Sequence, residues 1–369
     1  MSGVGSTDPP RSGGAGSAGT GAGRNRLERL AATLEQPLLV TSGVNVFYLT
    51  GMSSSNAAVL VDPGGDVTLY TDFRYAKKAA TVEGVEFVQT ARAVIGDLAR
   101  ILSGRKIGIE SHVVTVAQLH ELRAGKVAAE PTSGIVEGLR AVKAPGELDA
   151  LRAAAAISDA AFAALAEERF VGRTEIELAW RMRELLHEHG SSELSFDTMV
   201  AAAENGSSPH SDNREAAIPA NTLVIVDAGC RVDGYASDCT RTFATGDLDD
   251  DLARMYEMCL HAQLAGLEAM GPGVTGRDAD AAARDVIAAA GWGEEFGHGL
   301  GHGIGLEVHE APASRPESSD TLEAGNVLSC EPGIYLPGRA GVRIEDMVLI
   351  TADARERLTT IGKELVTVG

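Results

Sequence analysis

The sequence predicts an α/β domain followed by a larger, internally duplicated α+β domain. Short strand-like runs alternate with helical stretches as far as Val142, and from Glu147 onward the helices become long and amphipathic. In that second part, each half of a weak internal repeat runs from two helices into a strand pair that carries two acids. The length of 369 residues exceeds what most single cores support, so two domains are expected.

The composition is that of a globular protein and argues against two classes of partner. Hydrophobic residues make up 44% of the chain and charged residues 23%. The net charge of −20 disfavours nucleic acid as a partner, and no apolar run is long enough to cross a membrane. The four cysteines form no Cys-x-x-Cys pair and no secretion signal is present, so we expect a cytoplasmic protein whose cysteines are reduced packing residues.

The chain divides into a tail and two domains. Residues 1–26 are mostly Gly, Ser, Ala, Thr and Pro, and they have too few apolar side chains to offset the entropy of ordering. A disordered tail is therefore expected over residues 1–26, an α/β domain over 27–142 and the second domain over 143–369. Lys143–Gly146 is the expected linker.

The first domain shows the alternation of a small α/β fold. A helical stretch begins at Leu27, and the turn residues Pro63–Asp66 separate two β-prone runs, which predicts a hairpin. The strand-like runs are Pro37–Val40, Ala57–Val61, Val67–Thr71 and Lys106–Glu110.

Capping and periodicity define the helices of the second domain. A helix near Glu147–Glu168 is followed by Thr174 and Glu177, which form a capping box for another helix. In the second half, Gly273–Asp278 opens a helix, and the helix before it has apolar residues at i, i+3, i+4 and i+7, namely Leu252, Met255, Tyr256 and Cys259.

The strand pair of the first half carries Asp227 and Asp238. Asp233-Gly234, between the two strands, is a strong signal for a two-residue hairpin turn. With that turn Asp227 faces Thr240, and the two aspartates share one face as diagonal neighbours, with about 7–8 Å between their α-carbons. Their carboxylates can then share metal ions.

The strand pair of the second half carries Glu331 and Glu345. Both are equally far from Gly338 in the turn-like segment Pro337–Gly341, so an odd-membered loop centred there places them directly opposite each other. Exposed acids at strand ends that serve only solubility are the alternative. Both pairs lie on otherwise apolar runs, however, where a solvated acid is unexpected. The two hairpins are therefore expected to face each other across one site.

A glycine-rich segment, Gly297–Glu310, adds three histidines to these acids, His298, His302 and His309. A flexible loop with exposed histidines is the alternative reading of this segment alone. Four carboxylates without a cation would repel one another, whereas one histidine and four carboxylates suit a pair of divalent ions about 3.5–4 Å apart. The chain has no Gly-x-Ser-x-Gly, His-Glu-x-x-His or phosphate-loop motif that would indicate another chemistry.

These residues resemble the pita-bread metallopeptidases, and within them the Xaa-Pro peptidases aminopeptidase P and prolidase. The likeness covers nearly the whole chain after the tail. Asn45–Gly51 and Thr71–Tyr75 look like the family's creatinase/prolidase-like N-terminal domain. In the second domain, which the resemblance implies is a pita-bread domain, an ordered set of residues matches the family's five metal ligands: Asp227, Asp238, His302, Glu331 and Glu345.

The resemblance also implies a role for each ligand. Asp238 and Glu345 would bridge both metal ions, and Asp227 would complete one of the two sites. His302 and Glu331 would complete the other site, and Glu331 would also act catalytically as the proton shuttle. Manganese is the expected ion, and cobalt and zinc are the alternatives.

Four further residues match the family's substrate side. His210 corresponds to a substrate-side histidine, although a lone loop histidine can also be an ordinary surface residue. His298 and His309 match the two histidines that flank the ligand histidine, and Arg343 fits the arginine beside the last glutamate. The three histidines are implied to be catalytic and, together with Arg343, to bind the substrate.

The expected function is release of the N-terminal residue from peptides with proline in second position, by a homodimeric Xaa-Pro aminopeptidase. An Xaa-Pro dipeptidase, or prolidase, is the alternative. The intact ligand set argues against creatinase and against a non-catalytic interaction module of the same fold. The substantial N-terminal domain favours the Xaa-Pro branch over methionine aminopeptidase, which shares the ligands.

Overall fold

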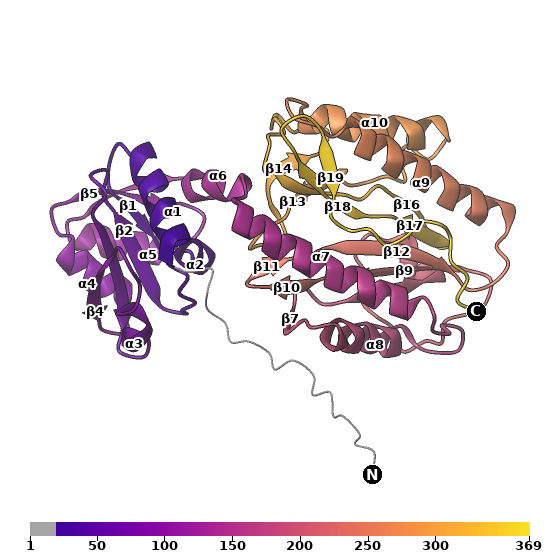
Figure 1. Cartoon of the computed structure of the whole chain (residues 1–369), viewed down its shortest axis with the longest axis horizontal. Coiled ribbons are helices and arrows are strands. Elements are labelled where there is room, and N and C mark those ends of the chain that lie inside the picture. The colour runs from indigo at the N-terminus through magenta and orange to yellow at the C-terminus, as the bar shows by residue number, and fades with distance from the viewer. Residues whose placement is uncertain (1–19) are drawn as a thin grey trace, which may run out of the picture. The chain divides into compact units, whose positions relative to one another are not determined.

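A mixed six-stranded sheet forms the centre of the first unit of the molecule (Figure 1). The computed structural model describes residues 20–369, which divide into two units between Ser133 and Gly134. The sheet has the order β4-β3-β2-β1-β5-β6. Its strands are β1 Leu38–Val40, β2 Ala57–Val61, β3 Val67–Asp72, β4 Glu86–Thr90, β5 Lys106–Glu110 and β6 Ala128–Thr132. The helices are α1 Thr20–Thr33, α2 Gly43–Thr50, α3 Ala76–Ala79, α4 Val94–Ile101 and α5 Val116–Ala124.

The predicted hairpin of this unit is present. β2 and β3 pair in antiparallel fashion with Ala57 opposite Thr71, so the turn lies where the sequence placed it. β1 pairs antiparallel with β2 and parallel with β5, which makes the sheet mixed. Leu98 of α4 and Leu122 of α5 are buried with apolar residues of the strands, so this unit has a core of its own.

The prediction of a disordered tail is wrong for residues 20–26, which begin helix α1. Arg26 explains the difference, because its Nη1 donates to the carbonyl oxygen of Tyr48 at 2.8 Å and its guanidinium lies 4.4 Å from the centre of the Tyr48 ring. Leu27 and Leu30, further along the helix, are buried, so the apolar face of the helix also anchors it. Residues 1–19 of the predicted tail lie outside the described part of the chain.

The division after Ser133 also differs from the boundary that the sequence suggested, after Val142. Helix α6, Ile135–Ala141, belongs with the second unit. Its Arg140 forms ion pairs with Glu307 and Glu310, and Asn326 Nδ2 donates to the carbonyl oxygen of Ala141 at 3.0 Å. These contacts with residues far along the chain have no local sequence signal.

The second unit consists of two α+β halves, as predicted, and Figure 1 shows α9 and α10 on one side of its strands and α8 on the opposite side. Phe162 of α7 and Met182 of α8 share a core with the strands of the first half, and Met255 of α9 and Ile287 of α10 share one with those of the second. The predicted capping box of Thr174 with Glu177 begins α8, and Thr275 caps α10.

The first half of this unit contains α7 Pro145–Leu165, α8 Glu175–Glu188, β7 Glu193–Leu194, β8 Met199–Ala202, the 3₁₀ turn Ala203–Ser207, β9 Leu223–Ala228, β10 Cys230–Val232, β11 Tyr235–Ala236 and β12 Cys239–Ala244. The second half contains α9 Asp250–Ala269, α10 Gly276–Ala289, β13 Gly301–Gly303, β14 Glu310–Ser314, β15 Val327–Cys330, β16 Gly333–Leu336, β17 Ala340–Arg343, β18 Asp346–Ile350 and β19 Arg355–Arg357. The strands pair in the orders β11-β10-β7, β12-β9-β8, β14-β13-β15-β18-β19 and β16-β17.

The register predicted for the first acidic hairpin is confirmed. Asp227 of β9 lies opposite Thr240 of β12. Asp233 and Gly234 both have positive φ, 50° and 87°, as a type I′ two-residue turn requires. The same register runs from the turn through β10 and β11 into β9 and β12, so the whole hairpin follows from the turn.

The register predicted for the second acidic hairpin is confirmed as well. Gly333 pairs with Arg343 on one side of the two glutamates, and Cys330 pairs with Asp346 on the other. Both pairings belong to one register, which places Glu331 opposite Glu345. Gly338, at the centre of the turn, has a φ of 72°, a left-handed conformation that glycine adopts without strain.

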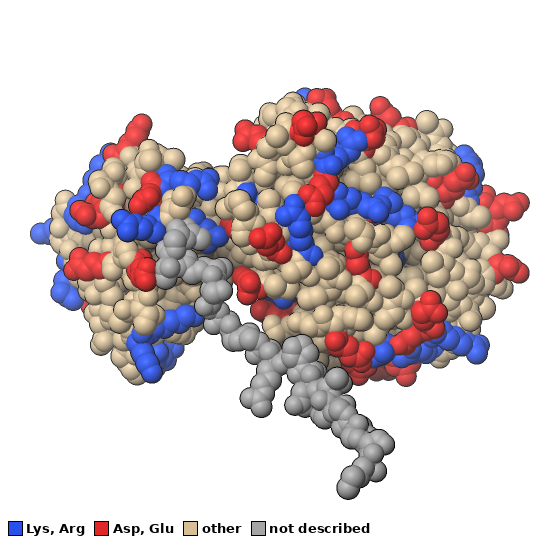
Figure 2. Space-filling view, in the orientation of Figure 1, with Lys and Arg blue, Asp and Glu red and all other residues tan. Residues whose placement is uncertain are grey.

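Charged and sulfur-containing side chains follow ordinary patterns elsewhere. All four cysteines are buried and free, as predicted for packing residues. Lys and Arg are interspersed with Asp and Glu over the face that Figure 2 shows. Within residues 20–369, none of the helices combines the length and the apolar character that a membrane crossing requires.

Candidate metal centre

All nine site residues named from the sequence line one cavity of about 790 Å³ in the second unit. They are Asp227, Asp238, His302, Glu331, Glu345, His210, His298, His309 and Arg343. They are arranged by depth. Asp238 and Glu345 are buried, Asp227, His302 and Glu331 are half-buried, and His210 and His309 are exposed. The acids therefore form the floor of the cavity, and the two exposed histidines lie nearer its mouth.

Asp227 lies within β9, and the other three acids lie where a hairpin crosses from one sheet to the next. Asp238 falls between β11 and β12, and Glu331 and Glu345 fall in the breaks between β15 and β16 and between β17 and β18. In the first hairpin a glycine makes the break possible, because a Cβ on Gly229 would lie 1.9 Å from the carbonyl oxygen of Ser237.

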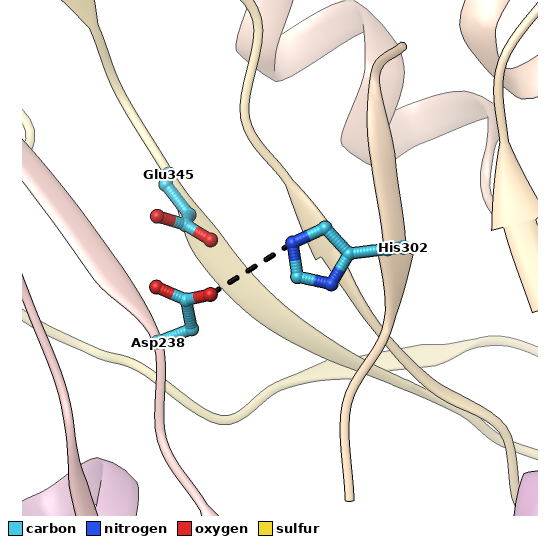
Figure 3. Close-up of side chains that lie close together, drawn as sticks. All are labelled: Asp238, His302 and Glu345. Carbon is cyan, nitrogen blue, oxygen red and sulfur yellow. Dashed lines mark ion pairs between the residues drawn. The ribbon is translucent and has the colours of Figure 1, made fainter. Parts of the chain in front are cut away.

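Three predicted ligands come close together, as Figure 3 shows: the carboxylates of Asp238 and Glu345 lie side by side, and the His302 ring points toward them. One ligand atom from each lies within 4.8 Å of the others. His302 Nε2 is 3.8 Å from an Asp238 oxygen and 3.0 Å from a Glu331 oxygen. His302 Nδ1 donates to the carbonyl oxygen of Gly303 at 3.2 Å, so Nε2 is the nitrogen directed at the acids.

The electrostatics of these residues indicate that a cation belongs among them. Burial raises the pKa of both Asp238 and Glu345 well above the usual range, and the neighbouring carboxylates raise it further. Burial lowers the pKa of His302, but the hydrogen bond to Glu331 together with the charges of Glu331 and Asp238 outweighs burial and raises that pKa to about 9. Burial raises the pKa of Glu331, but the hydrogen bond and charge of His302, with the charges of His298 and Arg343, lower it to about 2.

Two buried carboxylate oxygens indicate whether divalent ions fit the cavity. Asp227 Oδ1 and Glu345 Oε1 are buried, and neither has a hydrogen-bond partner among the described residues. A buried carboxylate oxygen left without a partner is costly, and a cation supplies what it lacks. Four carboxylates and one imidazole are also the donor types that hard and borderline divalent ions prefer. The residues present therefore fit a pair of divalent ions.

Arg343 is buried and fully engaged by its neighbours. Its Nη2 donates to Asp227 Oδ2 at 2.6 Å, and its Nη1 donates to Tyr335 Oη at 3.0 Å and to the carbonyl oxygen of Pro209 at 3.1 Å. Its Nε donates to Thr240 Oγ1 at 3.1 Å. The guanidinium thus fixes the orientation of Asp227 and ties the segment before His210 to the floor of the cavity.

The three histidines outside the predicted ligand set differ in their surroundings. His298 has both ring nitrogens engaged, with Nδ1 2.8 Å from the carbonyl oxygen of Gly299 and Nε2 3.0 Å from Tyr335 Oη, and burial lowers its pKa. The His309 ring stands edge-on to His302, with 4.2 Å between the ring centres. His210 lines the cavity at an exposed position.

Sequence reasoning missed three residues of this site. Thr240 Oγ1 donates to Glu345 Oε2 at 2.9 Å, and its place opposite Asp227 in the predicted register could have revealed it. Tyr335 joins His298 to Arg343, and nothing in its local sequence marks it. Arg315 lines the cavity and is exposed, but in the sequence it stands outside every motif.

Two sequence families account for nearly the whole described chain. Residues 149–352 match metallopeptidase family M24, and residues 26–142 match the creatinase/prolidase N-terminal domain. Together these matches cover both predicted domains, and the first covers more than half of the chain.

Similar proteins of known name are peptidases. The chain is 31% identical to an Xaa-Pro dipeptidase of Pyrococcus furiosus, over 93% of this chain and 100% of that one. Among solved structures, an Xaa-Pro dipeptidase from Bacillus anthracis superposes with a TM-score of 0.90 at 36% identity, over 94% of this chain and 99% of that one. An X-Pro aminopeptidase from Thermotoga maritima gives 0.84 at 29% identity, over 93% and 100%.

Proposed function

Because the chain belongs to metallopeptidase family M24, we propose that it is a two-metal Xaa-Pro peptidase with Xaa-Pro dipeptides as its preferred substrates. One observation carries the proposal. Two acidic hairpins and His302 converge on a single cavity, and two buried carboxylate oxygens there lack a partner among the described residues. We infer that these acids and His302 converge in order to hold cations.

The ligand assignment is part of the proposal. Asp238 and Glu345, the two buried acids, would bridge the ions, and Asp227 would complete one site. His302 and Glu331 would complete the other, since they already lie 3.0 Å apart. Two divalent ions, when bound, supply an activated water and an electrophile for the scissile carbonyl. We expect manganese, with cobalt and zinc as alternatives.

Glu331 is the proposed proton carrier. Its Oε1 accepts a hydrogen bond from Ser329 Oγ at 2.8 Å and faces His302, so the carboxylate is held at the floor of the cavity. From there it can take a proton from the attacking water and deliver it to the leaving amine, which needs one to depart. Ser329 would fix which oxygen of Glu331 is available for this transfer.

The surrounding histidines and arginines would bind the peptide. His210 and His309 are exposed beside the acids and can orient the scissile carbonyl and the proline side of the substrate. His298 would act mainly by holding Tyr335, because both of its ring nitrogens are engaged. Arg343 was expected to bind substrate directly, and its contacts favour a role through Asp227. Arg315, exposed on the cavity wall, suits the carboxylate of a dipeptide.

Proline in second position makes a dedicated enzyme plausible on chemical grounds. A bond to proline is a tertiary amide without an N–H, and its ring fixes φ, so enzymes that read an extended peptide through backbone hydrogen bonds handle it poorly. Metal ions provide the nucleophile and the electrophile without needing that N–H. The relatives named as Xaa-Pro dipeptidases support the same substrate class.

The second candidate is the Xaa-Pro aminopeptidase that the sequence favoured. The similar aminopeptidase structure from Thermotoga maritima supports it, as does a cavity whose volume is in the range of pockets for drug-sized ligands. The two named dipeptidases lie nearer in sequence identity, so we place the dipeptidase first. The expected homodimer is also a proposal, which light scattering of the purified protein tests.

The deciding experiment is hydrolysis of a matched series with manganese present: Ala-Pro, Ala-Pro-Ala, Ala-Ala and Ala-Ala-Ala. Fastest cleavage of Ala-Pro supports the dipeptidase, and equal or faster cleavage of Ala-Pro-Ala moves the enzyme to the aminopeptidase side. Faster hydrolysis of the two alanine-second peptides would overturn the proline assignment. Arg315→Gln should raise KM for Ala-Pro more than for Ala-Pro-Ala, because Arg315 is proposed to bind the carboxylate of a dipeptide.

A further inference from the structure

Four charged side chains meet at the start of β14, beside helix α6 (Figure 1). Arg140 Nη2 donates to Glu307 Oε2 at 2.8 Å and also to Glu310 Oε1. Lys143 Nζ donates to Glu310 Oε2 at 3.3 Å. The side chains of Arg140, Lys143 and Glu310 are 4%, 1% and 5% exposed, so these three are buried, and Glu307, at 50%, lies at the edge of the cluster.

The cluster closes the loop that carries His309. The backbone N–H of Glu307 donates to Glu310 Oε1 at 3.0 Å, so the Glu310 carboxylate joins the two ends of the turn 307–310. Arg140 forms ion pairs with both Glu307 and Glu310, so it also links the two ends of the turn. Gly305 packs against this carboxylate, since a Cβ there would lie 2.5 Å from Glu310 Oε2.

His309 and Glu310 are consecutive: His309 ends the bend that precedes β14, and Glu310 is the first residue of that strand. His309 lines the cavity and stands edge-on to His302, while Glu310 is turned away into the buried cluster. Because the two residues share a peptide bond, anchoring Glu310 restrains the backbone that carries the His309 ring.

We propose that Arg140 and Lys143 are positioning residues that set the orientation of His309 through Glu310. The inference rests on the proposed role of His309 in peptide hydrolysis. Stability alone is a weak reason for such a cluster, because apolar residues of similar volume commonly replace buried ion pairs without loss. Orientation of a side chain in the cavity gives these charges a function that apolar residues could not supply.

The test is a double-mutant cycle in the full-length, manganese-loaded protein, with Ala-Pro as substrate. Arg140→Met should lower kcat about tenfold in the wild-type background and change KM less than about twofold, because a misplaced group costs turnover. In the His309→Ala background the same substitution should change kcat less than about twofold, since the residue through which it acts is gone. An equal loss in both backgrounds would overturn the proposal.

A second readout does not depend on activity. The imidazole NMR signal that disappears in His309→Ala belongs to His309, and Arg140→Met should shift it. The matched control is Arg152→Met, which also breaks an arginine–glutamate pair of this unit, with Glu356 at 2.8 Å, but does not touch the loop. It should leave both kcat and the His309 signal unchanged. A His309 signal that stays in place in Arg140→Met would overturn the proposal.

The two readouts separate this inference from the proposed function. If the wild-type protein cleaves no Xaa-Pro peptide, the proposed function fails and the NMR comparison alone decides the positioning role. Should Arg140→Met not fold, Lys143→Met replaces it in both arms, because it removes the other charge on Glu310 and keeps a side chain of similar length. The results expected of Arg140→Met then apply to Lys143→Met, and so do the results that would overturn the proposal.

Discussion

Replacing Thr240 with valine should weaken metal binding through Glu345. The hydroxyl of Thr240 donates to Glu345 Oε2 at 2.9 Å and accepts from Arg343 Nε at 3.1 Å. Thr240 is wholly buried, so valine keeps its shape in the core and removes the hydrogen bonds of the hydroxyl. The other oxygen of Glu345 has no hydrogen-bond partner among residues 20–369, which leaves the hydroxyl as the group that fixes the carboxylate plane.

The size of the effect follows from the charge on the acceptor. A hydrogen bond to a charged group contributes about 1.5–3 kcal/mol. At about 1.4 kcal/mol for each tenfold change in Kd, its loss corresponds to manganese binding weakened by roughly ten- to a hundredfold. Mutations of groups that orient metal ligands commonly cost the same range.

The assay is calorimetric titration of manganese into metal-free protein. Thr242→Val is the matched control, because Thr242 is buried two residues along the same strand. Among the described residues its hydroxyl bonds only to the backbone of Arg343, at 2.9 and 3.1 Å. It should lower Tm but leave manganese affinity within about twofold. Unchanged affinity in Thr240→Val, or an equal loss in Thr242→Val, would refute the reasoning.

Three further predictions concern the same cavity. Chelation should abolish hydrolysis and manganese or cobalt should restore it, whereas Asp238→Asn and Glu345→Gln should each keep turnover below about a hundredth of wild type in a metal-rescue assay. His298→Ala and His309→Ala should lower kcat without releasing metal, as elemental analysis would measure; loss of a metal equivalent would mean that the ligand set is misassigned. In metal-free protein, Tm should fall as the pH rises from 6.5 to about 9. The pKa of His302 is raised in the folded state, so its protonated form stabilises the fold fully below pH 6.5, and this stabilisation is lost as the pH passes about 9. His302→Gln should flatten that fall in a thermal scan with chelator, and an unchanged slope would contradict the assignment.

The relative placement of the acids could be predicted because a hairpin register depends only on its turn. Asp233-Gly234 demanded a two-residue turn, and the pairing of Asp227 with Thr240 followed from it. In the second hairpin the position of Gly338 at the centre of the turn predicted that Glu331 lies opposite Glu345. Strand alternation then decided which side chains share a face. Short-range chemistry was sufficient because each partner lies within the same hairpin.

Contacts between distant segments could not be predicted in this way. Arg140 binds Glu310 across 170 positions, and no local pattern in α6 marks it as part of the second unit. Arg343 was placed beside the last glutamate by resemblance, but its bond to Asp227 depends on how the two hairpins pack. Helix α1 begins earlier than predicted because Arg26 donates a hydrogen bond to the carbonyl oxygen of Tyr48. In each case packing supplied the missing information.

The cluster behind the second acidic hairpin suggests that the site is held in place from outside the cavity. Asp346 follows Glu345 directly, is fully buried, and accepts from Arg241 Nη2 and Lys363 Nζ, each at 2.8 Å. Glu310 follows another cavity residue and likewise receives one arginine and one lysine. Asp346 is the first residue of β18 and Glu310 is the first residue of β14, so each anchored acid restrains the backbone of the residue before it, whose side chain lines the cavity. Rigidity at the cavity can therefore be tested by mutating residues that no substrate touches.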